Sequence, residues 1–187
     1  MKTMSRLLVG VFVCSTLGAF AQPPPPGQEA TPTAAQSAGA DVVDFKALLP
    51  ILPEPPEGWK AEDAEGSTDD LGNAQISSVH RDYTKNEGGD APTTSISILD
   101  SVASPEYVES TTAGWKLNET TAEGYAKPVN IDGSPGFETW EKEDKHGTLW
   151  LLVAKRYFLQ IETTGQDPQA LQEWLKRVDV KKLGATK

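Results

Sequence analysis

The sequence predicts an α+β domain in which an antiparallel sheet is sandwiched between helices. Three observations support this fold class. Segments rich in β-branched residues, separated by glycine-containing turns, indicate consecutive strands joined mostly as hairpins, which argues against a doubly wound parallel sheet. Both side-chain parities of these strands carry apolar residues, so both sheet faces are expected to be covered. Near the C-terminus, an apolar stripe at helical spacing indicates a helix packed on the sheet: Leu171, Trp174, Leu175 and Val178.

The folded domain is expected to span residues 41–187. Residues 41–49 form a predicted short helix with an Asp cap at its start. Pro50 is expected to end this helix, because a proline disfavours the helical conformation of the residue before it. The three prolines within residues 51–58 then keep the chain extended up to the first strand.

Turn and cap residues separate the remaining elements. Asp132-Gly133 is a type I′ hairpin signal, because both positions tolerate a positive φ. Gly88-Gly89 and Lys145-His146-Gly147 mark two further turns. An N-cap followed by proline, at Ser104-Pro105 and again at Asp167-Pro168, predicts one helix running to about residue 113 and the C-terminal helix. The predicted strands are residues 59–65, 74–84, 93–102, 124–131, 134–142, 148–154 and 156–163.

Strand parity sorts the apolar residues onto two faces. One parity of the central strands is strongly apolar, with Ile96, Ile98, Tyr157, Leu159 and Ile161. The opposite parity is also apolar, although an antiparallel sheet wetted on one side should be polar there. That second set comprises Leu99, Trp150, Leu152 and Phe158, while the parity of Trp140 is ambiguous.

Residues 1–21 have the three parts of a secretory signal peptide. A basic start is followed by an apolar run from Leu7 to Phe20 and an Ala-Phe-Ala site, with cleavage expected after Ala21. The run is too short for a membrane anchor, since fourteen helical residues reach about 21 Å of a ~30 Å hydrocarbon core. Lipidation of Cys14 is a weaker alternative, because the preceding Val13 is not a small residue. The protein is therefore expected to be secreted or periplasmic.

Residues 22–40 are rich in Pro and Ala and contain no large apolar residue, which predicts a disordered linker.

The composition of the mature chain excludes several classes of function. Cleavage removes Lys2, Arg6 and the only cysteine, leaving 15 basic against 27 acidic side chains and a net charge of −12. Without a thiol the mature chain lacks disulfides and Cys–metal sites. The negative charge argues against nucleic acid as a partner, and no integral membrane span is expected in the mature form.

With these elements assigned, the chain resembles a family of short secreted bacterial proteins of unknown function. The resemblance rests on Leu52-Pro53 with Gly58-Trp59, on Arg81-Asp82-Tyr83, on residues 129–138 and 152–158, and on the closing Leu-x-x-Trp helix. The arrangement also resembles the PsbP/Mog1-type fold, a central antiparallel sheet between helices. That resemblance implies assembly, accessory or binding roles rather than catalysis, and it implies no ligand residues.

Few residues suit acid–base chemistry. His146 is expected in a solvated turn. His80 and Asp82 share one side of a predicted strand and could orient an imidazole for an envelope hydrolase, although a structural polar contact accounts for the pair equally well. The sequence contains no H-E-x-x-H, Walker or G-x-G-x-x-G motif. We therefore expect a protein that is not an enzyme and has no cofactor.

The acidic segment 62–70 is expected to be a solvated loop, with weak Ca²⁺ binding as the alternative. Its spacing does not match an EF-hand, so no metal is assigned; the weak candidates are Glu62, Asp63, Glu65, Asp69 and Asp70. Tryptophan is frequent at binding hot spots. Trp140 and Trp150 lie on consecutive strands and are the candidate binding surface. The favoured function is a secreted or periplasmic binding or accessory module for an unknown protein or small ligand.

Overall fold

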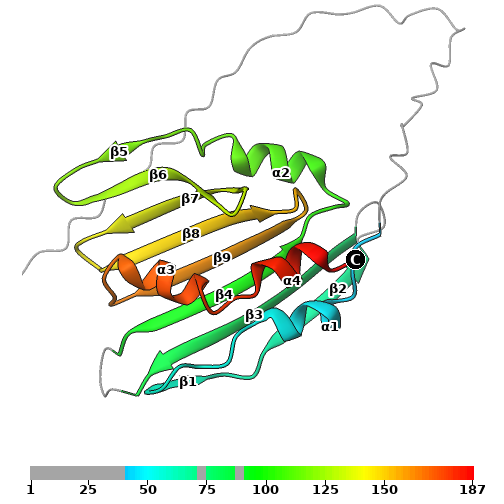
Figure 1. Cartoon of the computed structure of the whole chain (residues 1–187), viewed down its shortest axis with the longest axis horizontal. Coiled ribbons are helices and arrows are strands. Elements are labelled where there is room, and N and C mark those ends of the chain that lie inside the picture. Colours follow the sequence, from blue (N-terminus) through cyan, green and yellow to red (C-terminus); the bar gives the residue numbers. More distant parts are fainter. Residues whose placement is uncertain (1–40, 71–74, 87–90) are drawn as a thin grey trace, which may run out of the picture. The chain divides into compact units, whose positions relative to one another are not determined.

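The computed structural model describes residues 41–70, 75–86 and 91–187. These residues form a nine-stranded antiparallel sheet with a few short helices, which confirms the α+β class (Figure 1). The predicted signal peptide, the linker of residues 22–40 and the Gly88-Gly89 turn lie outside the described residues.

The sheet runs in the order β1-β3-β4-β9-β8-β7-β6-β5, and β2 pairs with β3 beside β1. The long meander from β6 to β9 follows sequence order, as expected for hairpin-linked strands. The strands of the whole sheet are β1 (Trp59–Ala61), β2 (Glu65–Asp70), β3 (Gln75–Lys85), β4 (Thr93–Asp100), β5 (Glu119–Thr120), β6 (Gly124–Ile131), β7 (Ser134–Glu141), β8 (His146–Val153) and β9 (Tyr157–Thr164). The helices are α1 (Phe45–Leu48), the 3₁₀ turn η1 (Leu49–Ile51), α2 (Pro105–Thr112), α3 (Gln169–Leu175) and α4 (Val180–Ala185).

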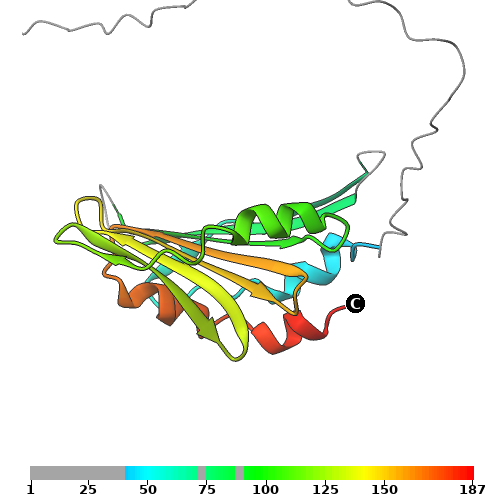
Figure 2. The ribbon, with the colours of Figure 1, turned by 90° about the horizontal axis from the view of Figure 1, so that it is seen from above.

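One face of the sheet, here called the core face, is covered by α1, α3 and α4 (Figures 1 and 2). Cross-strand neighbours Val79, Ile98, Leu159 and Leu151 form one buried row across it. The apolar stripe of the C-terminal region packs against these strands, and its four predicted members are all buried. Burial of this surface supplies the main stabilisation of the domain.

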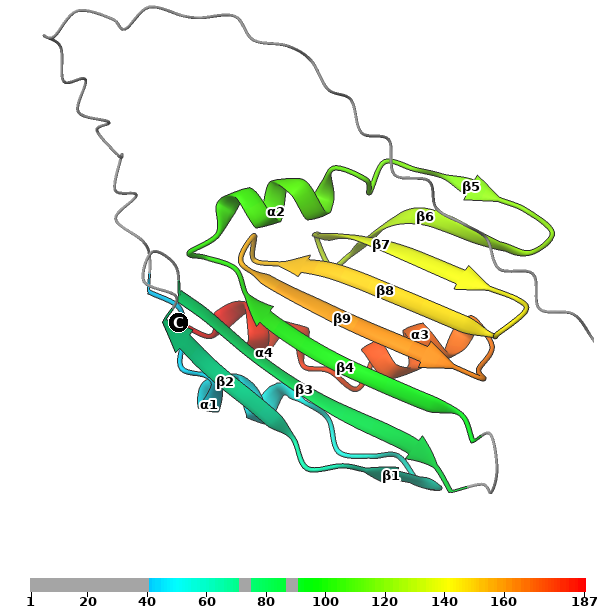
Figure 3. The same cartoon turned by 180° about the vertical axis from the view of Figure 1, so that it is seen from behind.

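The opposite face, here called the α2 face, is covered only in part. Figures 2 and 3 show α2 on this side of the sheet, away from the other helices. Leu99, Phe158 and Leu152 are cross-strand neighbours here, and the latter two are buried. The same face continues into polar rows such as His80–Ser97–Gln160. Apolar residues of the second parity are therefore confined to the end of the face nearest α2.

Two predicted helices differ in detail from the structure. α1 ends at Leu48, before Pro50 as expected, but Leu49 has a helical conformation, because the chain continues as the 3₁₀ turn η1, where a proline near the start needs no N–H. Asp44 provides the cap for α1 by accepting from the Lys46 N–H at 2.9 Å. The C-terminal helix ends at Leu175, and Asp179 caps a separate helix, α4, by accepting from the Lys182 N–H at 2.9 Å.

Two strand assignments also need correction. The predicted strand 59–65 is split into β1 and the start of β2, both paired along β3. His146 is not in a turn: it is the first residue of β8 and pairs with Glu141. The turn lies one residue earlier, at Lys145, which has a φ of 46°. The Asp132-Gly133 hairpin is confirmed, with positive φ values of 51° and 85°.

A buried ion pair ties the start of the domain to the sheet. The Asp100 side chain is fully buried and accepts from Arg156 Nε at 2.9 Å and Nη2 at 2.7 Å. The same carboxylate accepts from the Val43 N–H at 2.8 Å, while Arg156 also donates to the Asp41 carbonyl at 3.0 Å. A buried carboxylate needs such complete pairing, since an unpaired charge in the interior is strongly destabilising.

The proline-rich segment is fixed to β3 by polar contacts. Tyr83 is fully buried, and its hydroxyl donates to the Pro53 carbonyl at 2.7 Å. Arg81 donates to the same carbonyl at 3.3 Å and pairs with Glu54 at 3.2 Å. Trp174 packs against the Tyr83 ring with centroids 4.7 Å apart. Burial raises the pKa of Tyr83 to about 12.

This pKa predicts a loss of stability at alkaline pH. The unfolded chain releases the Tyr83 proton near pH 10, and the folded protein releases it near pH 12. The stability that the protonated Tyr83 hydroxyl gives the folded state is therefore fully present below pH 10 and is lost as the pH rises from 10 to 12. Two pKa units correspond to about 2 to 3 kcal/mol. In urea unfolding, Tyr83→Phe should be about 1 kcal/mol less stable at pH 8, from the lost hydrogen bond. The free energy of unfolding of this variant should fall less steeply than that of wild type as the pH rises towards 11.5. If the two free energies fell in parallel with pH, the stabilising role assigned to the Tyr83 hydroxyl would be contradicted.

Candidate functional site

Four aromatic side chains gather where α2 meets the sheet. Phe158, on β9, is 2% exposed and lies at the centre. The rings of Tyr107, Trp115 and Trp150 each meet it edge-to-face, with centroids 5.5, 6.0 and 6.3 Å away. Such T-shaped contacts are a favoured geometry for aromatic pairs. They hold α2 and the residues after it against the sheet.

This cluster opens to solvent on its outer side. Within the described residues, the two large hydrophobic side chains classed as exposed are Tyr107, at 42%, and Leu117, at 52%. Tyr107 is in α2, and Leu117 follows that helix two residues after Trp115, which is half-buried like Trp150. We call Tyr107, Trp115, Leu117 and Trp150 the aromatic surface.

The helix that carries this surface is attached lightly. None of the residues of α2 is buried. Ser104, its N-cap, makes no side-chain capping bond, while Thr112 turns its hydroxyl back onto the Val108 carbonyl at 2.8 Å. Threonine-rich helices have low intrinsic propensity. The contact of Tyr107 with Phe158 is the aromatic attachment of α2 to the sheet, and Trp115 adds a second one just after the helix.

The structure separates the two tryptophans chosen from the sequence. Trp140 and Trp150 lie on β7 and β8, which do pair, but Trp140 is opposite Gly147 and Trp150 is opposite Phe137. The register therefore turns their side chains to opposite faces of the sheet. Trp150 belongs to the aromatic surface, whereas Trp140 stacks on Tyr125 at 6.4 Å on the core face. The two residues do not form one surface.

His80 and Asp82 both lie on the α2 face, as their spacing predicts. They pair with Ser97 and Ser95 of β4, and no hydrogen bond joins them in the described structure. His80 Nε2 instead lies 3.9 Å from Glu65, and 48% of its side chain is exposed. His146 is on the same face, 3.6 Å from Glu162. Each imidazole thus neighbours a carboxylate on an adjacent strand or hairpin, a pattern expected of cross-strand polar pairs.

The acidic segment 62–70 is a loop only over residues 62–64. Residues 65–70 form β2, an edge strand whose side chains are all exposed. A strand directs successive side chains to opposite sides, so its carboxylates do not converge; Asp69 accepts from the Ser67 hydroxyl at 2.7 Å. Across the described residues, no group of three or more His, Cys, Asp or Glu side chains could hold a metal ion.

A buried carboxylate also links the outer strands to α3. Glu138 is 3% exposed and accepts from the Tyr125 hydroxyl and from Gln172 Nε2, each at 2.7 Å. Lys127 Nζ forms an ion pair with the same carboxylate, 3.1 Å from Glu138 Oε1. Burial and this hydrogen bond raise the pKa of Tyr125 well above its ordinary value. These contacts tie β6 and β7 to α3 through one carboxylate.

Comparisons with known proteins give no assignment: no family model, curated protein or solved structure matches the chain. Among the described residues, no helix is both long enough and apolar enough to span a membrane. The aromatic surface is the site that the geometry singles out. Sequence reasoning identified Trp150 but missed Tyr107, Trp115 and Leu117. The available signal was three large apolar residues within and just after a helix without an apolar stripe.

Proposed function

We propose that this protein is a secreted or periplasmic, non-enzymatic binding or accessory module that docks a partner protein through the aromatic surface. The observation that carries the proposal is the exposure of Tyr107, whose ring meets Phe158 together with those of two half-buried tryptophans. Leu117, which is also exposed, follows one of these tryptophans by two residues. Exposed apolar groups that form a patch are typical of protein interaction sites, and Tyr and Trp are enriched at binding hot spots. The predicted signal peptide supports the location.

The composition favours a protein partner over a nucleic acid. The full chain carries a net charge of −10, and phosphate recognition requires clustered basic side chains. The polar rows beside the aromatic surface, including Ser97 and Gln160, could serve as the hydrogen-bonding rim of an interface.

We also propose a PsbP/Mog1-like arrangement for the domain. Its support is the placement of α1, α3 and α4 on one face of the antiparallel sheet and of α2 on the other (Figure 2). Members of that fold class act as assembly or binding factors, which agrees with the proposed role. An experimentally determined structure with a different strand order would remove this likeness without affecting the docking proposal.

Site-specific photo-crosslinking tests the docking surface. A photoreactive residue in place of Leu117 should give one reproducible crosslinked partner in extracts of the envelope or medium. The same residue in place of the exposed Glu57, outside the aromatic surface, should not. Equal crosslinking from both positions, or none from position 117, would rule out this surface as the docking site.

A further inference from the structure

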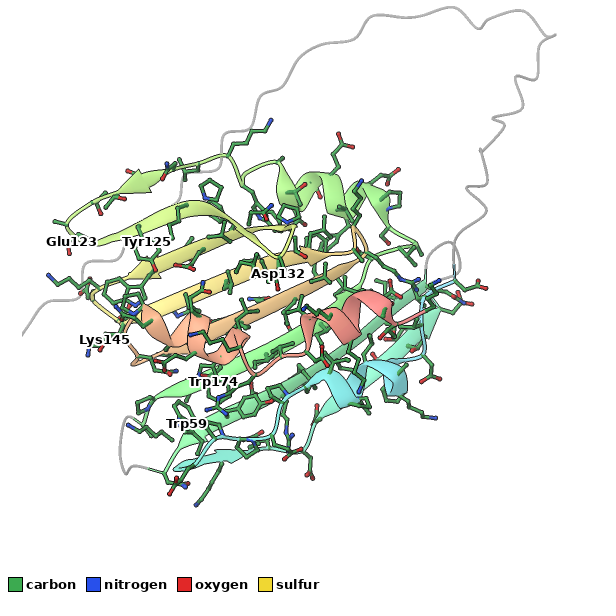
Figure 4. All side chains as sticks on the ribbon, in the orientation of Figure 1. Trp59, Glu123, Tyr125, Asp132, Lys145 and Trp174 are labelled. Atoms are coloured by element: carbon green, nitrogen blue, oxygen red, sulfur yellow. The ribbon has the colours of Figure 1, made fainter. Side chains whose placement is uncertain are left out.

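A groove lies on the core face between the β6–β7 turn and the connection from α3 to α4. Its volume is about 520 Å³, with Ile131 and Asp132 on one side and residues of α3, α4 and their connection on the other. Figure 2 shows the β6–β7 hairpin bending towards the level of α4, and Figure 4 labels Asp132 at this turn. The groove is on the opposite side of the sheet from the aromatic surface.

The floor of this groove is apolar. Leu175 and Val178 are each 6% exposed and belong to the core cluster, while Ile131 and Val180 are half-buried against it. An apolar group entering the groove would remove hydrophobic surface from water, which is favourable in proportion to the area covered. The floor therefore suits the hydrocarbon part of a ligand.

Three cationic residues also line the groove. Lys176, Arg177 and Lys181 contribute to the groove and are all exposed, and the described structure gives none of them an ion pair. Two acids are present, Asp132 and Asp179, but the latter already caps α4 through the Lys182 N–H. Three cations against two carboxylates give the lining a net charge of +1, and the three cationic groups make no ion pair within the described residues.

This charge contrasts with the rest of the chain. Residues 175–187 contain five of the seventeen basic side chains and one of the twenty-seven acidic ones. A local positive site on a protein with a net charge of −10 concentrates anions at that site and disfavours them elsewhere. Guanidinium and ammonium groups bind carboxylates by charge-assisted hydrogen bonds.

We propose that the groove binds a small amphiphilic anion, with a hydrocarbon chain on the apolar floor and a carboxylate among Lys176, Arg177 and Lys181. The volume lies in the range of small-molecule sites, about 300 to 1,000 Å³. The charge complementarity selects an anion, and the buried floor selects an apolar chain. This inference is independent of the proposed docking function, because the two sites use opposite faces of the sheet.

Titration calorimetry with sodium decanoate, below its micelle-forming concentration, tests the proposal on the purified protein. Decanoate should bind with one-site stoichiometry. Decanol, which lacks the charge, and decyltrimethylammonium, which reverses it, should bind at least about tenfold more weakly. Raising the salt concentration should weaken decanoate binding further. Equal affinity for the three ligands would overturn the proposal.

Charge-matched variants locate the site. Lys176→Gln, Arg177→Gln and Lys181→Gln together should weaken decanoate binding about tenfold or more. The control combines Lys116→Gln, Lys142→Gln and Lys187→Gln, which removes the same charge from exposed positions outside the groove lining and should leave affinity within about twofold. Equal losses would show a general charge effect and contradict the site. Binding of an acidic, leucine-containing peptide but not of decanoate would likewise contradict it.

Discussion

Asp100→Asn is expected to lower the free energy of unfolding by about 3 kcal/mol. The substitution keeps the shape of the side chain but removes the charge that Arg156 contacts at 2.7 and 2.9 Å. It also directs an amide N–H₂ group towards a donor. Breaking a buried pair typically costs about 3 to 5 kcal/mol, and the lower value applies because the Arg156 side chain left behind is 19% exposed.

Urea unfolding of Asp100→Asn beside Asp63→Asn measures this effect. Asp63 is exposed, so its variant should stay within about 0.5 kcal/mol of wild type. Combining Asp100→Asn with Arg156→Gln should cost less than the sum of the single variants, because each change removes the same contact. Additive losses, or an Asp100→Asn variant as stable as the control, would contradict the role assigned to this ion pair.

Phe158→Ala is expected to have a comparable or larger effect, about 3 to 4 kcal/mol. Phe158 is buried at the centre of the aromatic cluster, and its removal leaves a cavity beneath three rings. It should also loosen α2, since that helix has no buried residue of its own. Hydrogen exchange of residues 105–112 should accelerate more than exchange in β3, which lies on the far side of β4.

Tyr107→Ala is the matched control for that variant. Tyr107 contacts the same ring but is 42% exposed, so its truncation should cost about 1 kcal/mol or less. The two variants should differ widely in the free energy of unfolding if Phe158 is the buried floor of the aromatic surface and Tyr107 is part of its exposed rim. Equal losses would mean that Tyr107 serves as core rather than as a binding group.

The sequence was sufficient for the strands of the meander and for the hairpin at Asp132-Gly133. These elements depend on short-range signals: β-branched alternation and residues that accept a positive φ. The apolar stripe of the C-terminal region was also predicted correctly. Its residues at i, i+3 and i+4 lie within α3 and are buried, although the helix ends before α4 begins. The first helix does end before Pro50, but the expected non-helical conformation of Leu49 was wrong, because a proline suits the first turn of a new 3₁₀ helix.

The binding surface could not be derived in the same way. Whether Trp140 and Trp150 share a face depends on the register across the β7–β8 turn, and a shift of one residue reverses the answer. The edge strand β2 has no apolar face and forms by pairing its backbone with β3. The groove beside α4 brings together segments forty or more residues apart, which only the tertiary arrangement determines.

The central claim is that the aromatic surface binds a partner without being needed for the fold. The double variant Tyr107→Ser and Leu117→Ser tests it directly, because both side chains are exposed. Its free energy of unfolding should lie within about 1 kcal/mol of wild type, while recovery of the partner crosslinked from a photoreactive residue at Trp115 should fall at least tenfold. A folded double variant that recovers this partner as well as wild type does would contradict the account.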